Sequence, residues 1–223
     1  MAPVVPDAEA SPYPDGAVVM APLSGYTDIP FRSACRRNGC AFAFTPLIDS
    51  GCIVHGRCWD DPALARGKDE PWLGVQLLGA SPGDLGEAAA VLNDGDYDLL
   101  DFNMGCPMPK VTKRGAGAAL GNDVGLAVRC IEALVSRSRF GVTAKMRPLY
   151  ENDPEPTVRM ARALEGAGIR ALTIHGRVWS RIYDGPLAPG VIPALPESRG
   201  VTLVPNCRVG AKESRGPRRG HRK

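Results

Sequence analysis

The sequence of 223 residues contains no apolar run near the roughly 18 residues that a membrane-spanning helix needs. It also lacks the charged start and apolar stretch of a secretory signal peptide. We therefore expect a soluble, cytoplasmic protein with no membrane partner. Hydrophobic residues make up 44% of the chain, which is enough to build one domain, or part of a larger one, around a real core.

The cysteines lack the paired spacing of a zinc site. The chain has seven of them, an odd number, and the cluster Cys35, Cys40, Cys52 and Cys58 contains no CxxC pair. We expect a reducing compartment in which these residues are free thiols of the core or the surface, and we predict no metal site.

The positive charge of the chain is concentrated at its end. The net charge is +3, but residues 210–223 carry six Lys or Arg and one Glu, a net of +5 that leaves −2 on the remainder. Such a Gly/Pro/Arg-rich segment is typically disordered, although it could contact nucleic-acid phosphates. We expect a flexible lead-in over residues 1–16, an ordered domain over residues 17–206 and a disordered basic tail over residues 207–223.

Apolar strand-like runs alternate with amphipathic helical runs along the ordered part. Seven strands are predicted, at residues 18–22, 41–46, 73–78, 99–103, 142–147, 171–175 and 201–206. Helical spacing of apolar residues predicts helices over residues 29–38, 82–92, 124–137 and 157–167. This alternation indicates an α/β protein with a parallel sheet covered by helices.

Two parallel architectures compete for this pattern. A doubly wound dinucleotide-binding sheet should carry GxGxxG after its first strand, but residues 21–28 read APLSGYTD. In a (β/α)₈ TIM barrel, polar residues at the carboxyl ends of many strands converge on one site. Such residues lie towards or just after the carboxyl ends of most of the predicted strands: Ser24, Gln76, Asn103, Cys106, Lys145, Arg147, His175, Arg177 and Asn206. The pattern favours an incomplete (β/α)₈ TIM barrel.

The segment DFNMGCPMPK at residues 101–110 carries the strongest chemical signal. Gly105 and Pro107 stop the strand before it, so Cys106 is expected on a strand-to-helix turn, where α/β enzymes place catalytic groups. Without that context a lone cysteine is more often a buried structural thiol.

Two further patterns indicate a ligand. Lys145 and Arg147 alternate along one strand and so share a face, which suits an anion or an electron-rich ring. Gln76 lies in an apolar strand, where its buried amide needs a hydrogen-bond partner such as the edge of a flavin.

Together these motifs resemble the tRNA-dihydrouridine synthase family. The matching segments are MAPLSGYTDIPFR at 20–32, VQLLG at 75–79, DFNMGCP at 101–107, GAGAAL at 115–120, TAKMR at 143–147 and LTIHGR at 172–177, followed by Tyr183 and Gly185. They occur in the order of the family and extend from about residue 18 to residue 206.

The resemblance implies an FMN-containing TIM barrel that reduces uridine in tRNA to 5,6-dihydrouridine, with NADPH or NADH as reductant. Hydride from reduced FMN would reach C6 of the base, and the Cys106 thiol would be the catalytic general acid that protonates C5. Carried over by motif, the cofactor-binding residues would be Pro22, Leu23, Ser24, Gln76, Asn103, Lys145, His175 and Asn206. The substrate-binding residues would be Arg147, Arg177 and Tyr183.

The chain departs from the family after its last predicted strand. Residues 206–208 read Asn-Cys-Arg where the family has Asn-Gly-Asp, and neither an eighth strand nor a C-terminal helical domain follows. We therefore expect a truncated or frameshifted end. Two alternatives stay open: an inactive fragment or RNA-binding remnant, and another FMN barrel that acts on a free pyrimidine, such as a dihydroorotate dehydrogenase.

Overall fold

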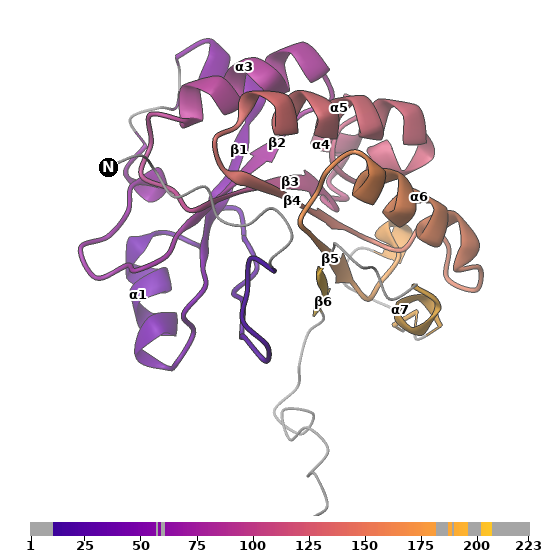
Figure 1. Cartoon of the computed structure of the whole chain (residues 1–223), viewed down its shortest axis with the longest axis horizontal. Coiled ribbons are helices and arrows are strands. Elements are labelled where there is room, and N and C mark those ends of the chain that lie inside the picture. Colours follow the sequence, from indigo (N-terminus) through magenta and orange to yellow (C-terminus); the bar gives the residue numbers. More distant parts are fainter. Residues whose placement is uncertain are drawn as a thin grey trace, which may run out of the picture.

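One parallel sheet organises the computed structural model, which describes residues 11–56, 58, 61–181, 187–188, 190–195 and 202–206. The order of its six strands follows the chain (Figure 1). They are β1 (Phe44–Asp49), β2 (Gly74–Leu78), β3 (Leu99–Met104), β4 (Gly141–Met146), β5 (Ala171–His175) and β6 (Thr202–Asn206). The predicted α/β class with a parallel sheet is confirmed.

Helices follow most of the strands. The α-helices are α1 (Ile29–Arg37), α2 (Ser50–Val54), α3 (Pro82–Leu92), α4 (Pro109–Thr112), α5 (Val124–Arg137), α6 (Glu155–Gly166) and α7 (Val191–Ala194). Short 3₁₀ turns are η1 (Pro62–Leu64), η2 (Gly117–Asn122) and η3 (Trp179–Arg181). The four predicted helices correspond to α1, α3, α5 and α6. None of the described helices has the length and apolar character to cross a membrane.

Local sequence signals explain where the longer helices begin. The side chains of Asp28, Ser81 and Asp123 each accept a hydrogen bond from a backbone N–H in the first turn of α1, α3 and α5. These caps satisfy donors that have no partner within the helix. Gly168 follows α6 with φ +100°, a conformation that glycine adopts without strain.

The prediction of a strand over residues 18–22 is wrong. In residues 18–22 only Val19 forms a parallel bridge, with Phe42, and the Met20 N–H donates to the Phe42 carbonyl oxygen at 2.9 Å. Pro22 has no N–H to continue a ladder, and Val18 is 68% exposed, so this segment gains little from becoming a full strand. The second predicted strand also begins later than expected, at Phe44.

The main core lies between the sheet and the helices on one of its faces. Figure 1 shows α3, α5 and α6 side by side over that face. The buried side chains that β3 and β4 contribute to it are Leu100, Phe102, Met104, Val142, Ala144 and Met146. Since side chains alternate along a strand, the residues between these point to the opposite face. They are mainly polar, and they form the candidate site described below.

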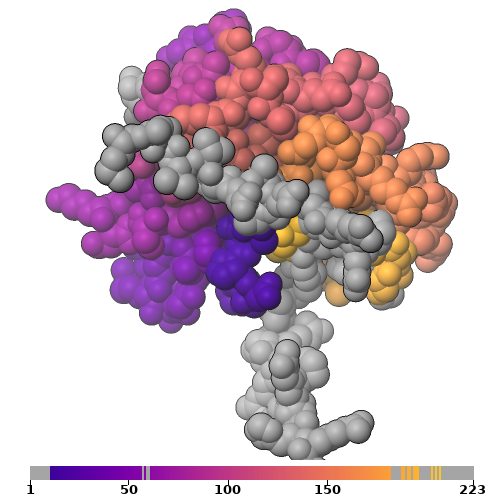
Figure 2. Space-filling view, in the orientation of Figure 1, coloured from indigo at the N-terminus to yellow at the C-terminus, as the bar shows by residue number. Residues whose placement is uncertain are grey.

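A smaller aromatic cluster packs at the amino ends of the strands. The ring of Tyr13 lies 5.6 Å from that of Phe42 and 5.9 Å from that of Trp72, measured between centroids. Tyr13 is only 6% exposed, so the expected flexible lead-in does not extend to it. Val19 and Val204 pack against the same cluster, which brings the N-terminal segment next to β6 (Figure 2). The sheet is therefore curled, with its two ends close together.

Candidate active site

Polar side chains from five strands share the face of the sheet opposite α3 and α5. Strand register places Gln76 and Thr143 on either side of Asp101, and Lys145 beside Asn103. It also places Thr173 beside Lys145, and His175 beside Asn206. This polar face comprises Gln76, Asp101, Asn103, Thr143, Lys145, Thr173, His175 and Asn206.

A chain of hydrogen bonds joins three of these residues to the Cys106 turn. Gln76 Nε2 donates to Asp101 Oδ2 at 2.6 Å, and Asn103 Nδ2 donates to Gln76 Oε1 at 2.8 Å. Asn103 Oδ1 then accepts from the backbone N–H groups of Gly105 at 3.1 Å and Cys106 at 2.9 Å. The amide of Gln76 therefore has partners within the protein, so its burial does not by itself indicate a flavin.

Cys106 lies on a turn that is braced from several directions. Arg147 Nε donates to the Gly105 carbonyl oxygen at 2.9 Å, and the Ala118 N–H donates to the Cys106 carbonyl oxygen at 3.0 Å. The Cys106 thiol is free and half-buried. The turn therefore places a free thiol just after the carboxyl end of β3, where the sequence predicted it.

Arg147 is more enclosed than a surface cation would be. Its exposure is 5%, and besides Gly105 it donates from Nη1 to the Arg177 carbonyl oxygen at 3.4 Å. The contacts named here brace the backbone of the site. A role of Arg147 or of Arg177 in holding substrate stays a prediction.

The electrostatics of the polar face follow from burial. Burial lowers the pKa of Lys145 to about 8; Asp101 opposes this shift, and Arg147 adds to it. Burial raises the pKa of Asp101, against hydrogen bonds from Thr143 and Gln76 and the charge of Lys145. Burial also lowers the pKa of His175 to about 4, with Arg147 and Lys145 adding to the shift, so its imidazole is neutral at pH 7.

A small cavity joins the polar face to the N-terminal segment. Its volume is about 30 Å³, and it is lined by residues that include Pro22, Lys145 and Asn206. Three of the predicted cofactor ligands thus meet here, although they are far apart in sequence. Leu23 and Ser24 lie on the exposed turn after Pro22. Tyr183 and the expected basic tail lie outside the described residues.

Asp101 is the residue that sequence reasoning missed. It is 2% exposed and accepts from both Gln76 and Thr143, whose Oγ1 lies 2.7 Å from Asp101 Oδ1. A signal was available, because a carboxyl group inside an apolar strand needs a buried partner just as the Gln76 amide does.

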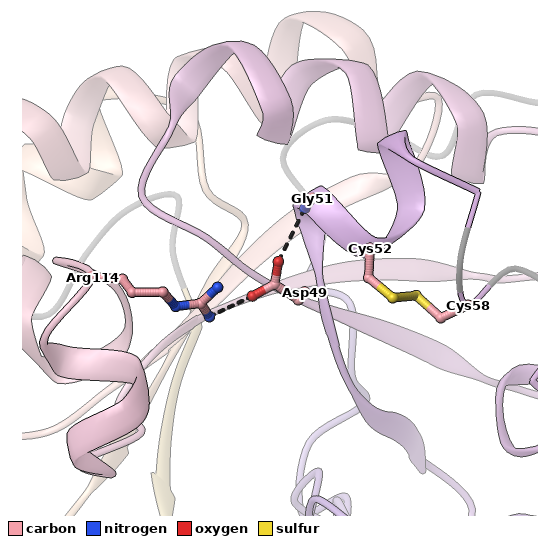
Figure 3. The surroundings of a disulfide bond; sticks show 5 residues. All are labelled: Asp49, Gly51, Cys52, Cys58 and Arg114. Atoms are coloured by element: carbon pink, nitrogen blue, oxygen red, sulfur yellow. Dashed lines mark hydrogen bonds and ion pairs between the residues drawn. A yellow bond between two sulfur atoms is a disulfide. The ribbon is translucent and has the colours of Figure 1, made fainter.

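A second cluster lies at the end of β1 (Figure 3). Asp49 accepts from the Gly51 N–H, which caps α2, and pairs with Arg114 from the loop after Cys106. Cys52 and Cys58 form a disulfide, so the expectation of free thiols is wrong for these two. The turn after α2 brings their Cα atoms to 5.7 Å, within the range that a disulfide needs. In the described part of the chain, no group of three His, Cys, Asp or Glu could hold a metal ion.

The chain is similar to known proteins over most of its length. The family model described as dihydrouridine synthase (Dus) matches residues 19–208. A tRNA-dihydrouridine synthase B of Pseudomonas aeruginosa is 32% identical over 88% of this chain, and a probable tRNA-dihydrouridine synthase of Rhodobacter capsulatus is 34% identical over 86%. These matches cover 59% and 60% of the relatives, so the chain spans about three fifths of their length.

The match to a solved structure is weaker. A crystal structure of 2,3-dimethylmalate lyase has a TM-score of 0.47 at 14% identity, and the match covers 86% of this chain and 75% of that one. This similarity is too low to identify the fold. The sequence matches do identify the family: this chain belongs to the dihydrouridine synthases.

Proposed function

We propose that the chain is an incomplete (β/α)₈ barrel that binds FMN on its polar face and reduces uridine in tRNA to 5,6-dihydrouridine. The observation that carries the proposal is the braced Cys106 turn, which is hydrogen-bonded through Asn103 and Gln76 to the polar face. Dihydrouridine synthesis is the activity after which the relatives are named, and for this chain it is part of the proposal.

The curvature of the sheet supports the barrel. All six strands are parallel and in chain order, and one cavity is lined from both ends of that order, by Phe44 of β1 and by Val204 of β6. An open doubly wound sheet keeps its two edge strands apart and reverses its strand order at a switch point.

The residues present fit the edge of a flavin ring. Lys145 and Asn206, which line the cavity, offer hydrogen-bond donors to ring nitrogen and carbonyl oxygen atoms, and Pro22 offers an apolar surface. Asn103 has a second N–H besides the one that it donates to Gln76. The cavity of about 30 Å³ is far smaller than a site that encloses a cofactor, so it could accommodate only part of the ligand. When bound, FMN supplies the hydride that C6 of the uracil receives, and NADPH or NADH would be the source of the electrons.

The chain itself would supply the proton and the positive charge. The Cys106 thiol would donate its proton to C5, on which negative charge develops once C6 has received the hydride. Arg147 and Lys145 place positive charge beside that turn, which favours an electron-rich base. The target uridine would have to leave its stack to reach the turn, and Arg147, Arg177 and Tyr183 are the residues predicted to bind the substrate.

The decisive test replaces the thiol. We expect Cys106→Ala to retain the FMN absorption bands of the parent chain and to lose dihydrouridine formation in tRNA by about 10² or more. Cys35→Ala, which removes another free, half-buried thiol, is the matched control and should keep the parent activity.

Other outcomes would separate the alternatives. Full activity in Cys106→Ala would rule out the general-acid role. A chain that binds no added FMN and reduces no uridine would match the inactive or RNA-binding remnant. Turnover of free dihydroorotate without tRNA would favour the dihydroorotate dehydrogenase alternative. A cytoplasmic location stays a prediction.

A further inference from the structure

The two ends of the hydrogen-bond chain on the polar face force the same orientation on the amides between them. At one end, the Gly105 and Cys106 N–H groups can only donate, so the atom of Asn103 that faces them must be its oxygen. At the other end, an oxygen of Asp101 accepts from Gln76, so the Gln76 amino group must face Asp101. The bond between Asn103 Nδ2 and Gln76 Oε1 is consistent with both ends.

Without Asp101, only one end of the chain would be fixed. The side-chain amide of Gln76 presents an oxygen and an amino group of nearly equal size, so it can reverse by rotation about its last bond. Once reversed, it would present its amino group to Asn103, and the Asn103 amide would have to reverse as well. The Asn103 amino group would then face the Gly105 and Cys106 N–H groups, and two donors facing each other form no hydrogen bond.

We propose that Asp101 is a positioning residue that acts through Gln76: it is a second fixed end of the chain and reinforces the orientation of the Asn103 amide that the Gly105 and Cys106 N–H groups favour. This steadies the Cys106 turn and leaves Asn103 only an N–H to offer a ligand. The two backbone donors occupy both lone pairs of Asn103 Oδ1, and Gln76 takes one of the two N–H bonds of Nδ2. A ligand at Asn103 must therefore provide an acceptor, such as a ring carbonyl oxygen. This last step rests on the proposed function.

The proposed role does not depend on the charge of Asp101. A protonated carboxyl group still has an oxygen that accepts from Gln76, while its O–H can turn to the Thr143 hydroxyl oxygen, 2.7 Å from Oδ1. What Asp101 supplies is an acceptor at a fixed position. Its 2% exposure keeps water from taking over that task.

Three variants test this role in the full chain. Asp101→Leu removes the acceptor, so the Gln76 amino group loses the partner that fixes it. Asp101→Asn keeps an acceptor at this position, because its carbonyl oxygen can face Gln76 while its amino group faces the Thr143 hydroxyl oxygen, so Asn103 keeps its orientation. Thr143→Val removes the other hydrogen bond to Asp101 and leaves the chain to Asn103 intact, which makes it the matched control.

The measurement is the hydrogen exchange of the Gly105 and Cys106 backbone amides by NMR, relative to the Val111 amide, which donates to the Met108 carbonyl oxygen nearby. We expect Asp101→Leu to speed exchange at Gly105 and Cys106 by about tenfold, and Asp101→Asn to stay within about threefold of the parent. Thr143→Val should leave both amides unchanged.

Two results would overturn the proposal. One is an unchanged exchange ratio in Asp101→Leu, and the other is an Asp101→Asn variant that loses protection as fully as Asp101→Leu. If Asp101→Leu does not fold, a folded and protected Asp101→Asn variant supports the role, and an Asp101→Asn variant that also fails to fold overturns it. The readout needs neither flavin nor RNA, so its failure is distinguishable from failure of the proposed function.

Discussion

Arg32 and Glu70 form a buried, two-bond ion pair across 38 positions of the chain. Arg32 Nε and Nη2 donate to Glu70 Oε1 and Oε2, both at 2.8 Å, and the two side chains are 0% and 1% exposed. Arg32 Nη1 also donates to the carbonyl oxygens of Thr27 and Ala63, so the guanidinium is well satisfied. The pair fastens α1 to the segment that enters β2.

Removing one partner of this ion pair should lower the free energy of unfolding by far more than the intact pair contributes to it. Arg32→Met leaves the Glu70 carboxylate buried without its main partner, and we expect a loss of about 3–5 kcal/mol in the free energy of unfolding. Urea denaturation measures it, with the exposed Arg37→Met as control. The double variant Arg32→Met with Glu70→Leu should recover part of the loss. A cost below about 1 kcal/mol for Arg32→Met would show that water reaches the site.

The same ion pair should make the free energy of unfolding depend on pH in the acid range. Burial alone would raise the pKa of Glu70, but hydrogen bonds from Arg32 and the Gly67 N–H outweigh it, and the pKa is lowered. A carboxyl group with a lowered pKa stabilises the fold above its unfolded value of about 4.3 and loses that contribution as the pH falls further. The parent should therefore lose its advantage over Glu70→Gln below about pH 4.

Gly117 is the position where a methyl group should disturb the Cys106 turn. It has φ +60°, and a Cβ there would lie 2.6 Å from the Cys106 carbonyl oxygen, which is backbone and has little room to move. We expect Gly117→Ala to destabilise the chain by about 2 kcal/mol or more and to speed alkylation of Cys106.

Gly115→Ala is the control for backbone strain alone. Gly115 also has a positive φ, of +76°, but a Cβ there would meet only the Ala80 side chain, at 3.8 Å. Gly115→Ala should lower the free energy of unfolding by about 1 kcal/mol and leave the reactivity of Cys106 unchanged. Equal effects of the two substitutions would mean that close contact with Cys106 does not matter.

Lys145 should make stability rise with pH in the alkaline range. Its pKa is lowered to about 8 in the fold, chiefly by burial, against about 10.4 in an unfolded chain. Between these values the unfolded state binds more protons, so stability increases with pH. Relative to Lys145→Met, the parent should gain on the order of 3 kcal/mol from pH 8 to pH 10.5. Urea denaturation measures this difference. A free energy of unfolding that changes by the same amount in both proteins over that pH range would contradict the prediction.

His175 should stay neutral through the physiological range. Burial and the charges of Arg147 and Lys145 lower its pKa to about 4, and its Nδ1 accepts from the Arg177 N–H at 3.3 Å. NMR of the ring should show Nε2 as the protonated nitrogen and no titration between pH 5.5 and pH 8. Lys145→Met should raise the pKa of His175. A parent midpoint near the ordinary value of about 6.5 would show that the ring is solvated.

Much of the fold could be predicted from local pattern. The helices α3 and α5 have the predicted bounds, because periodic apolar residues and capping side chains both act within a few positions of the chain. The strand at residues 18–22 could not be excluded in this way. Whether Val19 extends a ladder depends on Phe42 and on the missing N–H of Pro22, and the first of these is a matter of tertiary contact.

The sequence by itself determined the family, the alternation of strands and helices, and the place of Cys106 after β3, because motifs and stop signals are local. Only the tertiary structure decided that Asp101 and Gln76 meet, that Arg32 finds Glu70, and that Pro22, Lys145 and Asn206 border one cavity. These contacts join residues 25 or more positions apart, and their geometry is set by strand register and sheet curvature. No local pattern of side chains specifies either quantity.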